Sequence, residues 1–157
     1  MITTIIAASI FTAAALSELY SFQNSIKEIG SKNQDLLGSS VTIIGEARAA
    51  SSQGIVVWVK NTGQTSFSLS GSATNASYWD LFITFPNQTY TRFSYNANYQ
   101  IGCWSAQILD DNGVIGAWEY GETLQITIYT NSTPAGSYSI RLSLPNSLTV
   151  EDQFSLG

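Results

Sequence analysis

The sequence predicts a mainly β protein, in which an N-terminal hydrophobic α-helix is followed by an immunoglobulin-like antiparallel β-sandwich. From Met1 to Ile26 the only charged side chain is Glu18, which is typical of a hydrophobic helix. After Gly38 apolar residues alternate with polar ones, and this period of two indicates strands. Turn residues recur at short intervals there, as they do in sandwiches of many short strands. We therefore divide the chain into a helical region, 1–38, and a β-sandwich domain, 39–157.

The N-terminal region is long enough to cross a bilayer as a helix. At about 1.5 Å per residue, residues 2–26 would span roughly 38 Å, and a bilayer core requires about 20 mainly apolar residues. A cleaved secretory signal is less favoured because no Lys or Arg precedes the apolar run, although Ala13-Ala14-Ala15 would suit a signal peptidase. A buried soluble helix would need partners around its whole circumference. We favour a membrane anchor, or a helix bundled with its copies in a filament, since the many Ala residues allow close helix packing.

The helix is expected to continue past the apolar run as an amphipathic helix. Leu19, Phe22, Ile26 and Ile29 recur at helical spacing and form one apolar stripe. Gly38 is the expected stop. Such a stripe packs either on the chain's own domain or on the helix of a neighbouring copy.

Nine strands are expected in the sandwich domain, each bounded by turn residues. They are Val41–Glu46, Ile55–Lys60, Ser66–Ser70, Tyr78–Phe85, Thr89–Tyr95, Cys103–Leu109, Thr123–Thr130, Tyr138–Leu144 and Leu148–Phe154. Four Trp, seven Phe and eight Tyr must supply much of the core.

Composition argues against several classes of function. The net charge is −5 and the 6 basic residues are scattered, whereas binding nucleic acid requires clustered Lys and Arg. Histidine, the commonest general base and metal ligand, is absent. Cys103 is the only cysteine, so neither an internal disulfide nor a cysteine zinc site can form, and we interpret it as a small buried residue. We expect no nucleic-acid partner, no metal and no cofactor.

Two acidic arrangements are candidate sites of chemistry. The run Asp110-Asp111-Asn112-Gly113 offers oxygen ligands for Ca²⁺, but it lacks the spacing and the distal Glu of a calcium loop. We interpret it as a hairpin turn, which Asn112-Gly113 favours. The carboxylates of Asp80 and Glu119 could serve a glycosidase only at a suitable separation. No motif supports that reaction, so we expect that the protein is not an enzyme.

Three N-glycosylation acceptor motifs begin at Asn75, Asn87 and Asn131, in or beside expected loops. Lys27 and Lys32 follow the helix, and positive-inside counting would place that end in the cytoplasm. Against this stand the three acceptor motifs and the low Lys content. We therefore place the domain outside the cell.

Two blocks of the sequence resemble a known family. Val57-Trp-Val-Lys-Asn-Thr-Gly63 resembles the strand-and-turn signature of the archaellum accessory proteins FlaF and FlaG. The run Pro134–Asn146, followed by Glu151–Ser155, resembles their closing hairpin, and FlaG is the better fit. The short Ala-rich helix and Glu18 depart from the family pattern.

Within the first block, the turn residues Lys60, Asn61, Thr62 and Gly63 are explained by folding alone. Asn61 is expected to start the turn. Gly63 is expected to take a backbone conformation that is costly for other residues.

The resemblance implies a stationary, non-catalytic component of the archaeal motility machine, a stator. Such proteins cross the cell membrane once and hold a β-sandwich beneath the surface layer. FlaF-like members bind the surface-layer protein, and FlaG-like members associate with FlaF and with themselves. The implied partners are therefore a FlaF-like or FlaG-like protein, through it the surface layer, and further copies in a homo-oligomer.

A filament subunit is the alternative, with helices bundled in a central core and sandwiches forming an extracellular sheath. Archaellin and pilin precursors usually carry a basic leader, and none is visible, which favours the accessory protein. For assembly we expect contacts through an outer strand, either Leu148–Phe154 or Val41–Glu46. An aromatic patch around Tyr90, Tyr95, Tyr99 and Trp104 is a second possible contact.

Overall fold

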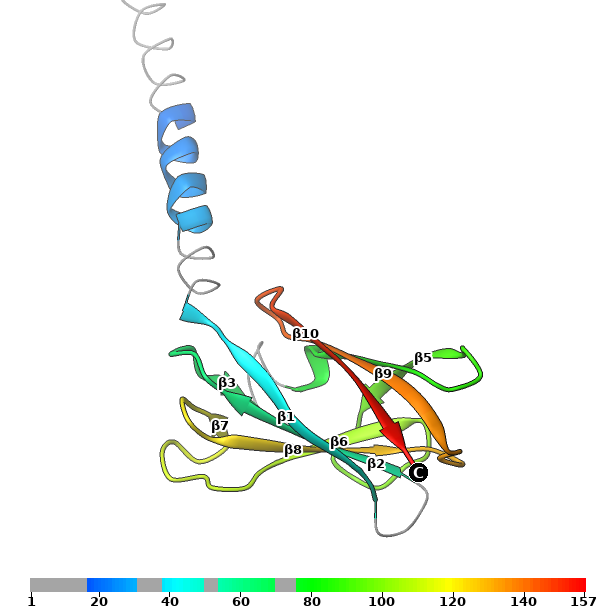
Figure 1. Ribbon diagram of the computed structural model, residues 1–157. Helices are drawn as coiled ribbons and strands as arrows, with labels where there is room; N and C mark the ends of the chain where they lie inside the picture. Colours follow the sequence, from blue (N-terminus) through cyan, green and yellow to red (C-terminus); the bar gives the residue numbers. More distant parts are fainter. Residues whose placement is uncertain (1–16, 31–37, 50–53, 70–75) are drawn as a thin grey trace, which may run out of the picture. The chain divides into compact units, whose positions relative to one another are not determined.

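The computed structural model describes residues 17–30, 38–49, 54–69 and 76–157 (Figure 1). The chain divides into two compact units, Met1–Leu37 and Gly38–Gly157. The described part of the first unit is a helix, and the second unit contains the described strands.

The helix of the first unit covers residues 17–30. Leu19, Phe22, Ile26 and Ile29 all lie on it, which confirms the helical conformation expected for them, and each is more than half exposed. The apolar run before Ser17 lies outside the described residues. Across the described ranges, no helix combines the length and the apolar character that crossing a bilayer requires.

The second unit is built from ten strands and one short 3-10 helix within the described residues. The strands are β1 (Val41–Arg48), β2 (Gly54–Asn61), β3 (Phe67–Ser68), β4 (Asp80–Thr84), β5 (Tyr90–Tyr95), β6 (Cys103–Ile108), β7 (Ala117–Trp118), β8 (Thr123–Tyr129), β9 (Gly136–Ser143) and β10 (Thr149–Leu156), and the 3-10 helix η1 is Ala76–Tyr78. Each of the nine expected strands overlaps an observed one. The additional strand, β7, has two residues, too few for an alternating pattern to be recognised.

The strands follow the order β1-β2-β8-β6-β5-β4-β9-β10, with β3 and β7 forming a separate two-stranded ribbon. The chain of pairings folds into two layers, β1-β2-β8-β6 and β5-β4-β9-β10, which confirms the mainly β sandwich (Figure 1). The expected antiparallel arrangement holds for every described pair except β5 and β6. These two strands are parallel over the two pairs Ser94↔Cys103 and Tyr95↔Trp104, where they link the layers.

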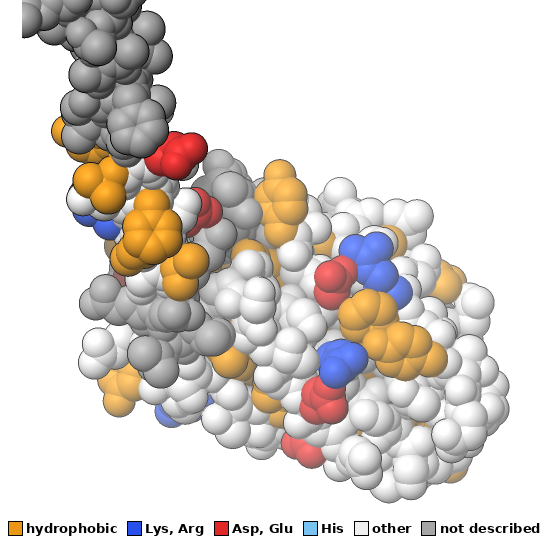
Figure 2. Space-filling view, turned by 90° about the horizontal axis from the view of Figure 1, so that it is seen from above, with side chains coloured by type: hydrophobic (Ala, Val, Ile, Leu, Met, Phe, Trp, Pro, Cys, Tyr) orange, Lys and Arg blue, Asp and Glu red, His pale blue; other side chains and the backbone are white. Residues whose placement is uncertain are grey.

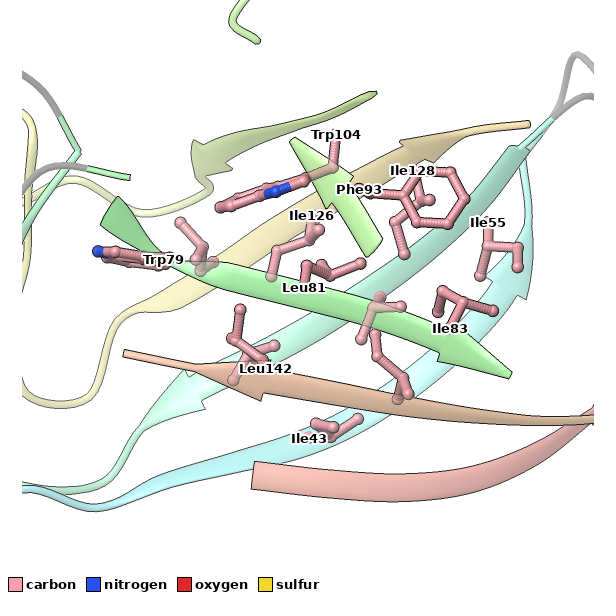
Figure 3. Packing of buried hydrophobic residues seen from close by; sticks show 14 of the residues in the cluster. Ile43, Ile55, Trp79, Leu81, Ile83, Phe93, Trp104, Ile126, Ile128 and Leu142 are labelled. Atoms are coloured by element: carbon pink, nitrogen blue, oxygen red, sulfur yellow. The ribbon is translucent and has the colours of Figure 1, made fainter. Parts of the chain in front are cut away.

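The core lies between the two layers and follows from the alternation along each strand. Leu124, Ile126 and Ile128 of β8 are fully buried, while the residues between them are half-buried. Leu81 and Ile83 of β4 face the same interior from the other layer (Figure 3). Burying both sets of side chains together is the main force that holds the layers.

Large aromatic side chains fill one end of this core. Trp79 lies 6.1 Å from Trp104 and 6.0 Å from Trp118 between ring centroids, and all three are buried. Phe67 of β3 packs on Trp79 at 6.1 Å between ring centroids, and this contact joins the small ribbon to the core. This aromatic cluster occupies the end of the sandwich where β2 ends and β8 begins.

The two outer strands of the strand order, β1 and β10, lie against each other but share no ladder pairing. Val41–Glu46 and Leu148–Phe154 therefore lie on the outer strands, as expected, and assembly through them stays a prediction. Glu46 of β1 contacts Asp152 of β10 at this seam. Burial first, and then the neighbouring negative charge of Asp152, raise the pKa of Glu46 above its ordinary value.

Candidate functional site

The turn after β2 is organised around one buried side chain. Asn61 is fully buried, and its Nδ2 donates hydrogen bonds to the carbonyl oxygens of Thr65 at 2.8 Å and Trp118 at 3.1 Å. Its Oδ1 accepts a hydrogen bond from the Gly63 amide at 3.0 Å, which shows that Asn61 starts the turn, as expected. Both donors and the acceptor of the Asn61 side chain are therefore satisfied.

Gly63 is required for a different reason from the expected one. It is not among the residues with positive φ, so the prediction of a costly backbone conformation is wrong. A Cβ at this position would collide with the backbone nitrogen of Ser40 and lie 2.5 Å from the carbonyl oxygen of Gly38. Backbone atoms cannot move aside as a flexible side chain can. The close approach of a second segment is what excludes a side chain here.

That second segment is Gly38–Ser40, which we call the attachment segment because it begins the second unit. The amides of Thr62 and Gly63 both donate to the carbonyl oxygen of Ser40 at 2.8 Å. The amide of Gln64 donates to the carbonyl oxygen of the segment's first residue at 2.7 Å. A hydrogen bond of 2.9 Å from Thr62 Oγ1 to Ser40 Oγ completes the contact.

The second block that carries the family resemblance reaches the same place. Asn146, in the turn between β9 and β10, donates from Nδ2 to Ser39 Oγ at 2.6 Å. Its Oδ1 accepts a hydrogen bond from the Leu148 amide at 3.2 Å, which orients the side chain. The two blocks, far apart in the sequence, therefore converge on the attachment segment.

A further layer of hydrogen bonds supports Asn61 from behind. The carbonyl oxygen of Glu122 accepts from the Asn61 amide at 3.1 Å and from Trp118 Nε1 at 2.9 Å. The Glu122 side chain is buried, and its carboxylate accepts from the amides of Asn112 at 3.1 Å and Glu119 at 2.7 Å. Two amide donors stabilise this buried charge.

The acidic run lies in the loop between β6 and β7, residues 109–116, and does not form the expected hairpin. Strand β6 pairs with β8, so Asn112-Gly113 does not join two paired strands. Asp111 Oδ2 accepts from the Gly116 amide at 3.0 Å, and Glu119 Oε2 accepts from the Val114 amide at 3.1 Å. Both carboxylates therefore bind backbone amides of this loop. Within the described residues, no three side chains gather as metal ligands.

Asp80 pairs with a base on the neighbouring strand. Its Oδ1 lies 2.6 Å from Arg92 Nη2 on the outer face of β4 and β5. On the same face Phe82 stacks on Tyr90 at 5.0 Å, and Arg141 pairs with a carboxylate of β10. Figure 2 shows hydrophobic side chains between oppositely charged ones on this side of the molecule.

Two of the three expected glycosylation acceptors lie beside one groove. Asn87 and Asn131 are exposed, and both line a groove of about 590 Å³. Phe85, Phe93 and Ile101 supply its apolar surface. Asn75 lies outside the described residues. The motifs alone could not show that the two acceptors are neighbours, because the groove joins segments that are distant in the sequence.

The expected aromatic patch does not form one surface. Trp104 is fully buried, and Tyr95 packs on it at 5.0 Å between ring centroids, so burial raises the pKa of Tyr95. Tyr90 and Tyr99 are exposed, and Tyr99 packs on Tyr129 at 4.7 Å. Cys103 is half-buried at the start of β6.

Comparison with solved structures identifies similar sandwiches. The archaellum periplasmic stator protein FlaG from Sulfolobus acidocaldarius is 20% identical with a TM-score of 0.56, over 74% of this chain and 99% of that chain. The archaellum periplasmic stator protein complex of FlaF and FlaG from the same organism gives 21% identity and a TM-score of 0.55, over 73% of this chain and 87% of that chain. The expected resemblance to FlaG is thereby confirmed at the level of the fold.

The sequence itself assigns the family. No curated protein matches the chain. The sequence model of the archaeal-type flagellin family, in contrast, matches residues 1–154, which include both compact units. This chain therefore belongs to the archaeal-type flagellin family.

Proposed function

We propose that the protein is a non-catalytic structural component of the archaellum and acts as a stator. In this proposal an N-terminal helix anchors residues 1–38 in the archaeal cell membrane by a single pass. The β-sandwich, residues 39–157, lies outside beneath the surface layer. It binds a FlaF-like or FlaG-like partner, through it the surface-layer protein, and further copies of itself. The family and the stator-like fold support this function.

The observation that carries the proposal is the way in which the attachment segment is held. Any force between a membrane-anchored helix and the sandwich passes along the chain through Gly38–Ser40. This segment accepts backbone hydrogen bonds from the turn after β2 and a side-chain hydrogen bond from the turn between β9 and β10. Load is thus distributed to both layers instead of falling on β1 alone. A stationary element that resists torque requires such an attachment and requires no reaction chemistry.

In this proposal Lys60, Asn61, Thr62 and Gly63 have a mechanical role. Asn61 fixes the turn by its hydrogen bond from the Gly63 amide, Gly63 donates from that turn to Ser40 of the attachment segment, and Thr62 adds an amide and a hydroxyl donor. Lys60 is exposed at the end of β2 and contributes to the strand pairing there.

The glycosylation acceptors follow from the proposed location. Asn87 and Asn131 are exposed, so they are accessible to an oligosaccharyltransferase if the domain is exported. We propose both, together with Asn75, as acceptors. Intact-mass measurement of protein purified from the native archaeon, compared with Asn→Gln variants, tests each acceptor.

A deletion strain of a swimming archaeon tests the stator function. We expect cells without the protein to keep filaments that do not rotate. We also expect the wild-type protein to fractionate with detergent-solubilised membranes. Loss of the filaments, together with recovery of the protein in sheared fibres, would contradict the stator.

The second candidate is a filament subunit with bundled N-terminal helices. The observation that favours it is the exposed apolar stripe of Leu19, Phe22, Ile26 and Ile29, which would be covered in a helical bundle. The deletion experiment distinguishes the two candidates, because a subunit is needed for the filament itself.

A further inference from the structure

The outer face of the layer β5-β4-β9-β10 carries a patch of aromatic and charged side chains. It consists of one aromatic pair and two ion pairs, which we together call the outer patch: Phe82 with Tyr90, Arg92 with Asp80, and Arg141 with Glu151. The two rings are almost parallel, at 7°, with their centroids 5.0 Å apart. Tyr90 is 56% exposed, and the four charged side chains are about half exposed. Most of the outer patch is therefore open to a ligand.

The register of the strands sets the positions within the outer patch. Phe82 of β4 lies opposite Arg92 of β5 and, on its other side, opposite Arg141 of β9. Arg141 in turn lies opposite Glu151 of β10. Arg141 also donates a hydrogen bond to the Tyr90 hydroxyl, which connects its ion pair to the aromatic pair. The rings are thus placed between two ion pairs by the sheet itself.

The charges of the outer patch select a neutral ligand. Its two Arg and two acidic side chains sum to zero, and the whole chain carries a net charge of −5, so anions gain no attraction there. The guanidinium groups donate hydrogen bonds and the carboxylates accept them. A sugar hydroxyl does both, and the axial C–H groups of a hexopyranose pack on the negative face of an aromatic ring. A neutral sugar therefore matches every group of the patch.

Another protein is a poorer match for the outer patch. The core of a protein interface is depleted in charged residues, whereas four of these six side chains are charged. A stable interface also takes about 20–30 residues on each side. The neighbours on this face, among them Ser139, Ser143 and Thr149, are small and offer no anchor for a partner. One exposed ring, in contrast, has the size of one sugar unit.

The outer patch is separate from the groove at which we place the glycans of this chain. Tyr90 and Arg92 alternate along β5 with Thr91 and Phe93, and the second two line the groove. Successive side chains of a strand point to opposite faces. A glycan that starts in the groove is therefore attached on the opposite face of this hairpin.

We propose that the outer patch binds a neutral saccharide carried by another molecule. One hexopyranose ring packs on the exposed ring of Tyr90, and its hydroxyls hydrogen-bond to the flanking ion pairs. This binding site goes beyond the proposed function and does not depend on it.

NMR titration of the full-length chain tests the site. The protein is produced in a host without N-glycosylation and kept in dodecylphosphocholine micelles, because a detergent with a sugar headgroup would compete. Cellohexaose and mannohexaose are the neutral probes, and hexagalacturonate is the acidic comparison. We expect the neutral probes at millimolar concentration to shift the resonances of Tyr90 and Arg92, with no effect of added salt. Absence of shifts with both neutral probes, or stronger binding of hexagalacturonate, would overturn the proposal.

Substitutions at one position separate binding from folding. We expect Tyr90→Thr, which removes the ring but keeps strand propensity, to weaken the affinity for the neutral probe about tenfold. Tyr90→Phe keeps the ring and should retain most of the affinity. Tyr120→Thr is the matched control, because Tyr120 is 71% exposed in the turn before β8, in the other layer. Circular dichroism checks that each variant is folded. Equal losses in Tyr90→Thr and Tyr120→Thr would overturn the site.

Two further outcomes would assign the outer patch to another occupant and overturn the proposal. If protein from the native archaeon fails to bind the neutral probes that the unglycosylated protein binds, the patch holds the chain's own glycan. If Tyr90→Thr changes the sedimentation of the full chain while neither probe binds, the patch is a protein interface. The stator proposal stands in both cases, because neither measurement concerns filament rotation.

Discussion

The two ends of the sandwich use their polar groups differently. At the end where β2 leads into its turn, Asn61 and Glu122 are buried with their side-chain hydrogen-bonding groups satisfied, beside the aromatic cluster. At the other end residues of both layers line a groove. There Asn87 lies in an exposed turn, and its Oδ1 accepts a hydrogen bond from the Thr89 amide. The same kind of Asn turn is thus buried at one end and exposed to solvent at the other. We expect the burial of an Asn side chain, and not its residue type, to decide how much its hydrogen bonds contribute to the free energy of unfolding.

Replacing Asn61 should cause the largest loss of stability among the variants that compare the two ends. We expect Asn61→Ala to lower the free energy of unfolding by about 3 kcal/mol, because each buried group that loses its partner costs about 1–3 kcal/mol. Denaturant unfolding of the full chain measures it. Asn87→Ala is the matched control, since it removes the same type of hydrogen bond in an exposed turn and should change stability by less than about 0.5 kcal/mol. Similar losses in both variants would remove the distinction between the two ends.

Filling the space at Gly63 should have the next largest effect. We expect Gly63→Ala to destabilise the sandwich by about 2 kcal/mol, because the added Cβ meets the backbone of the attachment segment. Thermal unfolding followed by circular dichroism measures the change. Gly30→Ala, whose Cβ meets nothing within 4 Å, should not destabilise the protein. A neutral Gly63→Ala would show that the attachment segment can move away.

The contact between β1 and β10 should make the stability of the protein depend on pH, with a smaller effect than the two substitutions above. The pKa of Glu46 is raised in the folded state, so the folded state holds the proton more tightly and stability falls as pH rises from about 4.5 through the raised pKa. We expect Glu46→Gln to raise the melting temperature at pH 7, because it removes the charge near Asp152. The gain should disappear at about pH 3, well below the ordinary pKa of 4.5, where the wild-type carboxyl is protonated in both states. An equal gain at pH 7 and at about pH 3 would argue against the pKa shift.

The groove end should show the smallest change in stability. Ile101 is 45% exposed, and we expect Ile101→Ser to alter the free energy of unfolding by less than about 0.5 kcal/mol. Chemical denaturation measures this. A loss of more than 1 kcal/mol would instead assign the groove to the core.

Sequence patterns predicted the strands well because alternation in a strand depends on residues two positions apart. The alternation of apolar and polar residues from Leu124 to Ile128 can be recognised without knowing which strands pair with β8. The parallel contact of β5 with β6 was missed because it depends on how the layers meet. Asn112-Gly113 predicts a hairpin locally, whereas the acceptors of the Asn112 and Val114 amides, Glu122 and Glu119, follow later in the chain.

The candidate site was predictable only in part. The motif from Lys60 to Gly63 was recognised, and so was the role of Asn61. The reason for Gly63 was not, because close approach involves residues more than twenty positions earlier. The second block was seen to resemble the family, but its contact with Ser39 is a property of the folded chain. The groove could not be predicted for the same reason.

The contact between β1 and β10 affects the tendency of this protein to aggregate at high concentration. An unpaired strand invites a strand from another molecule, and fibrous aggregation begins in that way. Here each border strand shields the other, and two carboxylates disfavour an intruding chain. Strand exchange between copies is therefore disfavoured at this seam, even at high protein concentration.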